Sequence, residues 1–395
     1  MKKGWQTKTL GEVFTTATGN TPPKNNAEFY GDFMPLVKPP ELCDDKLDSA
    51  DDGLSKSGAV VARTLPPNSI LVSCIGNLGK IGLNTVPVAF NQQINAILPN
   101  EKKAIPEFMF YQVLSSGFKE QLEALASGTT VPIVNKSKFN SIQIVLPPLA
   151  EQQRIVGILD TAFDGLATAK ANAAKNLLNA RSIFDSHLQA VFSQRGKGWV
   201  EKRLDELCTF SSGGTPSKGN SSYWLGEIPW VSGRDMKSTR LSDSALHISQ
   251  TAIDESATRM APAGTLLILV RGMGLAHGAQ IAELLVPCAF NQDIRGIYVK
   301  PALLPRYLLF ALRDRINSSD TVLSNAAHGT LKIDSNELQK VLIPFPPLEQ
   351  QWRIVGTIDG LTEETQRLAA IYQQKLAALE ALKKSLLHQA FSGEL

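Results

Sequence analysis

Few residues of this chain have the types and spacing that could do chemistry, and those few do not complete a catalytic centre. Gly76-Asn-Leu-Gly-Lys80 resembles a phosphate-binding loop, but its first glycine is too close to the lysine and no serine or threonine follows to hold magnesium. Arg271-Gly-Met-Gly274 follows an apolar run, as a dinucleotide loop would, but the third glycine is missing at its required spacing. We therefore expect ordinary glycine-rich turns at both places.

The loops of a base-methylating enzyme are also missing. An adenine methyltransferase needs a Phe-x-Gly-x-Gly loop for its cofactor and an Asn/Asp-Pro-Pro-Tyr/Phe loop for the flipped base. The diproline at Pro39-Pro40-Glu41 has neither the carboxamide or carboxylate before it nor the aromatic residue after it. The 5 histidines and 4 cysteines show no metal-binding spacing, and the cysteines are expected to be reduced and structural. The sequence predicts no catalytic residue and no metal site, so the chain is not expected to be an enzyme.

The composition is that of an ordinary folded protein. At 395 residues, 43% hydrophobic and 19% charged, the chain can form two or three cores. The net charge of +3 excludes a protein that is basic all over, so any surface for nucleic acid must be local. No apolar run reaches the roughly 18 residues that span a membrane, and the polar start at Met1-Lys-Lys-Gly-Trp5 is unlike a signal peptide. A cytoplasmic protein without a membrane partner is expected.

The elements that must position such a surface occur twice in the chain. Pro147-Pro-Leu-Ala-Glu-Gln-Gln-Arg154-Ile-Val returns half a chain later as Pro346-Pro-Leu-Glu-Gln-Gln-Trp-Arg353-Ile-Val. A unit that repeats once at this length predicts a duplicated domain pair with approximate two-fold symmetry. Two further repeated pairs are Thr18-Gly-Asn-Thr-Pro22 with Ser212-Gly-Gly-Thr-Pro216, and Ala89-Phe-Asn-Gln92 with Ala289-Phe-Asn-Gln292.

Each copy has the pattern of a mixed α and β domain. Short aliphatic runs bounded by Gly, Pro and Asn predict strands, and one helix per copy is expected, around residues 105–125 and 304–316. Gly-Thr turns at Gly128 and Gly329 are expected to lead into the last strand of each copy. The fold class is therefore α+β, with two pseudo-symmetric domains, residues 1–148 and 195–347, separated by two long antiparallel α-helices, residues 149–194 and 348–395. The expected strands include Ser69–Ile75, Ile142–Leu146, Thr265–Val270 and Val341–Ile343.

Both long segments begin after a proline pair and contain no further proline until a glycine near their end. At about 44 residues, each would form a helix of roughly 65 Å. Apolar residues recur at spacings of three and four, which predicts a coiled-coil seam in each. Because the two seams are equally long, we expect the helices to pack on each other; pairing with a second copy of the chain is the open alternative. The first seam is Ile155, Leu159, Ala162, Leu166, Ala169, Ala173, Leu177, Ala180, Phe184, Leu188 and Val191; the second is Ile354, Ile358, Leu361, Thr365, Leu368, Tyr372, Leu376, Leu379, Leu382, Leu386 and Ala390.

These motifs resemble those of the specificity subunit of type I restriction-modification systems. The resemblance rests on the Ser/Thr-Gly-x-Thr-Pro loop and the Pro-Pro-Leu helix start, each present twice, and it covers essentially the whole chain. It implies a non-catalytic subunit that recognises a bipartite double-stranded DNA sequence, with one target recognition domain per half-site and the helices as spacer. It also implies two modification subunits and two restriction subunits as partners. S-adenosylmethionine, ATP and Mg would then be bound by those partners, and no cofactor by this chain.

Under this resemblance, polar loop residues are the candidate DNA contacts. Base edges are read by Arg, Lys, Asn and Gln, and phosphates are held by Lys, Ser, Thr and backbone amides. Asn91-Gln92 and Asn291-Gln292 are assigned to the scaffold, because domains that read different half-sites should differ where they read. The candidate DNA contacts are Thr21, Lys24, Asn77, Lys80, Lys136 and Lys138 in the first domain, and Thr215, Lys218, Arg234, Lys237, Arg271 and His277 in the second. The candidate residues of the helix seam and of subunit docking are Arg154, Ile155, Leu159, Arg353, Ile354 and Ile358.

A coiled-coil adaptor that binds only proteins is the alternative function. It would have no need for two turn-rich, mildly basic domains, which have 14 Lys and Arg against 13 Asp and Glu in residues 1–148 and 17 against 14 in residues 195–347. DNA binding that weakens steeply with salt would separate the two hypotheses.

Overall fold

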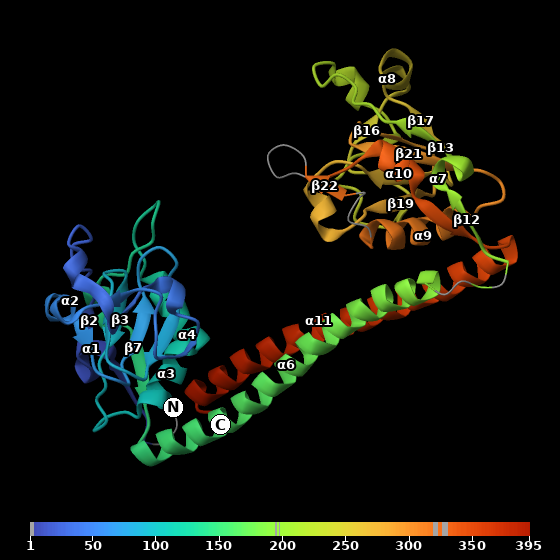
Figure 1. Ribbon diagram of the computed structural model, residues 1–395. Coiled ribbons are helices and arrows are strands. Elements are labelled where there is room, and N and C mark those ends of the chain that lie inside the picture. The colour runs from blue at the N-terminus through green and yellow to red at the C-terminus, as the bar shows by residue number, and fades with distance from the viewer. Residues whose placement is uncertain (1–3, 194–195, 197, 319–322, 326–330) are drawn as a thin grey trace. The chain divides into compact units, whose positions relative to one another are not determined.

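The computed structural model describes residues 4–193, 196, 198–318, 323–325 and 331–395, without the side chains of His277 and of 323–325. Its contacts divide the chain into two compact units, Met1–Lys175 with Tyr372–Leu395, and Asn176–Ile371. Each unit therefore contains one α+β domain, together with one end of each long helix (Figure 1).

The first domain is built from three sheets. A five-stranded sheet has the order β2-β10-β7-β8-β4, a four-stranded sheet β5-β3-β9-β6, and a two-stranded sheet β1-β11. The strands are β1 (Gln6–Thr9), β2 (Thr16–Thr18), β3 (Tyr30–Val37), β4 (Asp45–Leu47), β5 (Gly53–Leu54), β6 (Thr64–Leu65), β7 (Ile70–Ser73), β8 (Ile81–Asn84), β9 (Val88–Phe90), β10 (Ile94–Ile97) and β11 (Gln143–Leu146). The helices are α1 (Leu10–Val13), η1 (Ala27–Phe29), η2 (Pro39–Glu41), α2 (Lys56–Val61), α3 (Pro106–Leu114), α4 (Ser116–Ala124) and α5 (Lys136–Asn140).

The second domain repeats this topology sheet by sheet. Its orders are β13-β21-β18-β19-β15, β16-β14-β20-β17 and β12-β24, with an additional two-stranded sheet β22-β23. The strands are β12 (Val200–Arg203), β13 (Cys208–Ser212), β14 (Ile228–Val231), β15 (Arg240–Leu241), β16 (His247–Ile248), β17 (Met260–Ala261), β18 (Leu266–Leu269), β19 (Ile281–Leu284), β20 (Cys288–Phe290), β21 (Ile294–Val299), β22 (Leu323–Asn325), β23 (Leu331–Ile333) and β24 (Leu342–Phe345). The helices are α7 (Leu204–Leu207), η3 (Ser221–Trp224), α8 (Gln250–Glu255), η4 (Met273–His277), α9 (Pro305–Asn317) and α10 (Ser335–Lys340).

The predicted duplication is thus confirmed at the level of strand pairing. In both copies a central strand, β7 or β18, is buried at every position and pairs antiparallel on both sides. Both copies also contain the same two parallel pairs, β3 with β9 and β4 with β8 in the first, β14 with β20 and β15 with β19 in the second. A strand that is buried at every position is covered on both faces, so its sequence does not alternate with polar residues as that of an antiparallel strand with one solvated face does.

Two local predictions were wrong in detail. The helix expected around residues 105–125 is two helices, because Ser115 is extended (ψ 153°) and its hydroxyl accepts a hydrogen bond from the Phe118 amide, which starts α4. The turn at Gly128 does not lead directly into the last strand, since α5 intervenes, as α10 does in the second copy. Gly329 and Thr330 lie outside the described residues. The helix expected around residues 304–316 is confirmed as α9.

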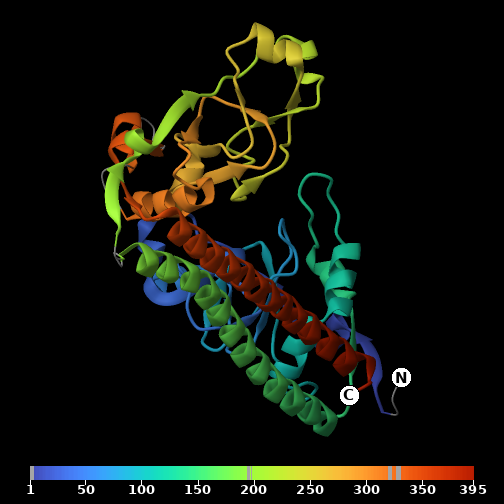
Figure 2. The ribbon, with the colours of Figure 1, turned by 90° about the vertical axis from the view of Figure 1, so that its right-hand side faces the viewer.

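The two long helices are α6 (Leu149–Ser193) and α11 (Leu348–Ser392), and they pack on each other antiparallel (Figures 1 and 2). In the first unit Arg154 near the start of α6 donates to Leu395 O (2.9 Å), and Lys170 further along pairs with Glu380. In the second unit, the last turns of α6 share a hydrophobic core with the first turns of α11. The partner of each seam is therefore the other helix of the same chain.

The seam residues also belong to the domain cores. Ile155 and Leu159 are fully buried among residues of the first domain and the last turns of α11, and Ile358 is fully buried in the second unit. Leu382 was predicted to lie in the seam but is 47% exposed. The half-buried Lys383 lies over the Phe163 ring instead, because a straight helix of 3.6 residues per turn drifts away from a fixed heptad pattern.

Three of the four cysteines are buried, which explains their chemical state. Cys74, Cys208 and Cys288 are buried and Cys43 is exposed, and all four are free. Burial raises the pKa of the Cys74 and Cys208 thiols to about 12 and of Cys288 to about 11. These three are inert thiols of the core, as predicted. In the described part of the chain, no helix is both long and apolar enough to cross a bilayer.

Candidate nucleic-acid interface

A single turn between two strands organises the loops at one end of the first domain. This turn joins β9 to β10, and three other segments form backbone hydrogen bonds to it as they leave β2, β3 and β7. Loops far apart in the sequence therefore emerge side by side. The bonds are Gly19 N to Ile94 O (3.2 Å), Asn91 N to Val37 O (3.0 Å) and Cys74 N to Gln93 O (2.8 Å). A fourth segment joins them through Val134 N to Cys74 O (2.8 Å).

The second domain uses the same bonds at equivalent residues. The turn from β20 to β21 receives the segments that leave β13, β14 and β18. We call the segments 19–26, 38–44, 74–80 and 132–135, with their counterparts 213–220, 232–239 and 270–280, the hub loops. The bonds are Gly213 N to Ile294 O (3.5 Å), Asn291 N to Val231 O (3.0 Å) and Val270 N to Asp293 O (2.8 Å).

The repeated Ser/Thr-Gly-x-Thr-Pro motif is explained by this turn. A Cβ atom on Gly19 would lie 2.2 Å from Asn91 O, and one on Gly213 would lie 2.2 Å from Asn291 O. Only glycine allows this close backbone approach. The next residue but one, Thr21 or Thr215, donates its hydroxyl to the side chain of Gln92 or Gln292. The prediction that the Asn-Gln pairs serve the scaffold agrees with these contacts.

Every candidate DNA contact of the first domain lies on a hub loop or on α5, which follows the fourth one. Lys24, Asn77 and Lys136 are exposed, and Lys80 is half-buried. The Lys138 ammonium donates a hydrogen bond to Leu125 O (2.9 Å). This bond ties α5 to the segment after α4, so the ammonium does not face outward. The structure therefore brings these residues together, with Thr21 and Lys138 partly engaged inside the protein.

The candidates of the second domain lie on three hub loops. Lys218, Arg234, Lys237 and Arg271 are exposed. The loop that carries Arg234 and Lys237 is fixed by Asp235, whose carboxylate accepts from the amide and hydroxyl of Ser232 at its start (2.8 Å each). The side chain of His277 lies outside the described residues. Exposed cations on a fixed framework are what contacts to phosphates and base edges require.

The two domains differ most clearly at one equivalent position. Ile75 and Arg271 each follow the central strand and each precedes a glycine with positive φ. Each also forms an isolated bridge, Ile75 with Ile133 and Arg271 with Lys332 on β23. The same backbone position thus presents an apolar side chain in one copy and a guanidinium in the other. The segment after Ile75 is a turn between the antiparallel strands β7 and β8, as predicted, whereas the turn expected after Arg271 is the 3-10 helix η4, between the antiparallel strands β18 and β19.

Two buried glutamines that the sequence analysis did not single out join the domains to the helices. The Gln152 amide accepts from Ile105 N (2.9 Å) and donates to Lys103 O (3.1 Å) and Pro147 O (2.9 Å). The Gln351 amide makes the equivalent bonds to Leu304 N (2.9 Å), Ala302 O (3.1 Å) and Pro346 O (3.0 Å). Both side chains are completely buried. The repeated Gln in the helix start is the signal that could have found them.

Replacing Gln152 or Gln351 with Ala is expected to lower the free energy of unfolding by about 1–3 kcal/mol, because one amide and two carbonyls lose buried partners. Urea unfolding measures the change. Gln153, the exposed neighbour in the same helix, provides the matched control. If Gln153→Ala cost as much as Gln152→Ala, the glutamine bonds would not be the cause.

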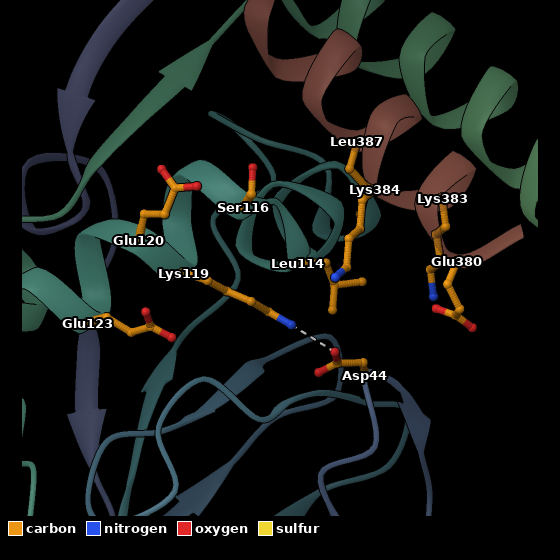
Figure 3. Close-up of a pocket in the computed structure, with 10 residues that line it drawn as sticks. All are labelled: Asp44, Leu114, Ser116, Lys119, Glu120, Glu123, Glu380, Lys383, Lys384 and Leu387. Atoms are coloured by element: carbon orange, nitrogen blue, oxygen red, sulfur yellow. Dashed lines mark hydrogen bonds and ion pairs between the residues drawn. The ribbon is translucent and has the colours of Figure 1, made fainter. Parts of the chain in front are cut away.

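A groove lies between the first domain and the end of α11 within the first unit (Figure 3). The ammonium of Lys119 on α4 is 2.8 Å from the Asp44 carboxylate, and Lys383 and Lys384 project from α11 toward them. Side chains of both charges line the groove. Within the described residues, no group of three or more His, Cys, Asp or Glu side chains could hold a metal ion.

Comparison with known proteins identifies the family. Residues 2–177 and 196–380 match the type I restriction modification DNA specificity domain. The HindI specificity subunit of Haemophilus influenzae is 31% identical over 190 residues, which cover 46% of this chain and 41% of that subunit. The EcoKI specificity subunit of Escherichia coli is 22% identical over 424 residues, which cover 100% of this chain and 90% of that subunit. A solved structure titled as the basis of complex assembly and conformational transition of the type I R-M system has a TM-score of 0.83 at 23% identity, covering 100% of this chain and 99% of that one.

Two α+β domains, two antiparallel helices and a duplicated turn with divergent loops define the specificity class of DNA-recognition proteins. The chain belongs to the family of type I restriction-modification DNA specificity proteins, whose domain it contains twice.

Proposed function

We propose that this chain is the non-catalytic subunit that selects the DNA sequence for a type I restriction-modification enzyme, with each domain recognising one half of a bipartite target. The observation that carries this proposal is the pair of turns with identical hydrogen bonds and different loops. A common framework with unlike exposed side chains is what two readers of different half-sites need. The family assignment supports the same function.

Two modification subunits and two restriction subunits are the proposed partners, since a pseudo-symmetric chain offers each docking surface twice. The helix starts are suitable places for docking. Arg154 and Arg353 are exposed there at equivalent positions, and Leu348 and Trp352 are 44% and 61% exposed on the first turns of α11. The partners would contribute S-adenosylmethionine, ATP and Mg, for which the sequence of this chain has no motif.

DNA binding by the hub loops would combine phosphate and base contacts. Lys24, Lys136 and Lys218 are suited to phosphates, while Asn77 and Arg271 can form paired hydrogen bonds with base edges. The logarithm of the binding constant for duplex DNA should therefore fall steeply and linearly with the logarithm of the salt concentration. Titration of the complex of this chain and its partner subunits with duplex DNA at several salt concentrations tests this dependence. Binding only to protein partners, with no affinity for DNA at low salt, would favour the coiled-coil adaptor.

Arg271→Ala is expected to cost about 1–3 kcal/mol of discrimination at a single base pair, because a guanidinium on this fixed turn can bind a guanine edge with two hydrogen bonds. Methylation rates on a panel of target variants, each changed at one base pair, measure this effect. Lys218→Ala is the matched control and should weaken all targets about equally. An equal loss on every target for Arg271→Ala would assign Arg271 to a phosphate.

A further inference from the structure

Each long helix carries an aspartate at the same place, and each aspartate holds a domain. Asp160 on α6 and Asp359 on α11 lie eight residues after the buried glutamines Gln152 and Gln351. Eight residues are slightly more than two turns, about 12 Å along the helix. Apolar side chains between the two positions, Ile155 and Leu159 on α6 or Val355 and Ile358 on α11, are buried in the domain core and hold the domain on its helix. The glutamine and the aspartate add directional hydrogen bonds at the two ends of this contact.

In the second unit the aspartate is part of a charge cluster. Arg306 on α9 donates through Nε (3.0 Å) and Nη2 (2.7 Å) to Asp359 Oδ1, and Arg240 on β15 donates to Oδ2 (3.1 Å). Arg306 also donates to Thr239 O (3.2 Å), and its side chain is only 10% exposed. Glu283 is the strand partner of Arg240. Burial raises the pKa of its carboxyl group, although the nearby Arg306 and Arg240 guanidinium groups act in the opposite direction. The cluster therefore connects β15, β19 and α9 of the domain to the helix.

In the first unit the attachment is of a different kind. The Tyr111 hydroxyl on α3 donates to Asp160 Oδ1, and the Tyr111 ring packs edge-on against Phe163 (centroids 5.3 Å apart). At the position of Arg306 this copy has Glu107. A phenol donates one hydrogen bond and carries no charge. The same helical aspartate is thus held by an uncharged donor in one copy and by two guanidinium groups in the other.

From this geometry we infer that Asp160 and Asp359 are positioning residues that set the angle of each recognition domain on its helix, and thereby the gap allowed between the half-sites. This inference rests on the proposed bipartite reading. One base pair corresponds to only about 3.4 Å along DNA, so a small change of this angle is enough to admit a neighbouring gap. The side chains that read bases are not touched, so the half-site sequences should not change.

Asp359→Asn in the full complex is the first test, read by mapping the methylated sites of a genome. This change removes the charged acceptor of the almost buried Arg306 and leaves a neutral amide in its place. Methylation at sites whose gap is one base pair longer or shorter should rise about tenfold or more relative to the normal gap, with both half-sites unchanged. Asp160→Asn should change little, because the amide oxygen still accepts from Tyr111. Tyr111→Phe, which removes the donor, should broaden the gap.

Two further variants separate positioning from folding. Arg306→Met with Asp359→Leu replaces the ion pair by apolar packing, which restores a stable core without directional bonds, and should still broaden the gap. Glu363→Gln removes one exposed charge from the same helix and should have no effect. An unchanged gap in both Asp359 variants would overturn the inference, and so would altered half-sites or loss of assembly in both. A wild-type target without two separate half-sites would instead reject the proposed function.

Discussion

A two-residue insertion after Asn179 in α6 is expected to abolish DNA methylation by the assembled complex. Two residues rotate the rest of the helix by about 200°. Leu188 and Phe192, now 4% and 2% exposed in the core of the second unit, would then face away from α11 and α9. Loss of both side chains from the core would cost several kcal/mol, since a buried Leu or Phe contributes about 2–5 kcal/mol each. Methylation of plasmid DNA by the purified complex is the measurement.

A four-residue insertion at the same place is the matched control. It lengthens the helix by about 6 Å and leaves the seam only about 40° from its original phase. Activity should survive, with a gap about one or two base pairs longer and with the same half-sites. If the longer helix worked on the original gap, the modification subunits and not the helices would set the spacing.

Exchange of residues 198–347 for the equivalent domain of a relative is expected to replace one half-site completely and to leave the other unchanged. The hub loops that differ between domains travel with the exchanged segment. The donor must keep an apolar face toward Leu188, Phe192, Val355 and Ile358, because these helix residues belong to the core of the second unit. Sequencing of the methylated sites gives the result directly. A hybrid in which both half-sites change would show that the domains do not read independently.

Much of the fold could be predicted because its signals are local or repeated. The proline pairs before Leu149 and Leu348 mark the helix starts, and the spacing of Ile155, Leu159 and Ile358 marks their buried face. The duplicated Gly-x-Thr-Pro motif led to the loops that meet at the β9–β10 turn. In each case a few neighbouring residues determine the outcome.

What could not be predicted depends on contacts between distant residues. The bonds of Gln152 to Lys103 and Ile105 cross 47 to 49 positions, and Arg306 reaches Asp359 across 53. The repeated Gln marks a shared role without naming its partners, and Arg306, which has Glu107 at the equivalent position, gives no sign at all. The break at Ser115 is a local signal that was missed: its hydroxyl donates to Gln112 O and accepts from Phe118 N, each three residues away. The drift of the seam at Leu382 likewise depends on helix geometry over many turns.

The methylated sequence of a genome that carries this chain and its modification subunit tests the central proposal most directly. Two different specific half-sites, separated by a gap of fixed length and unspecified sequence, with a modified base in each half-site and methylation lost when this chain is removed, are the predicted result. A single continuous recognition sequence, or methylation that persists without the chain, would contradict the proposal that its two domains each read one half of the target.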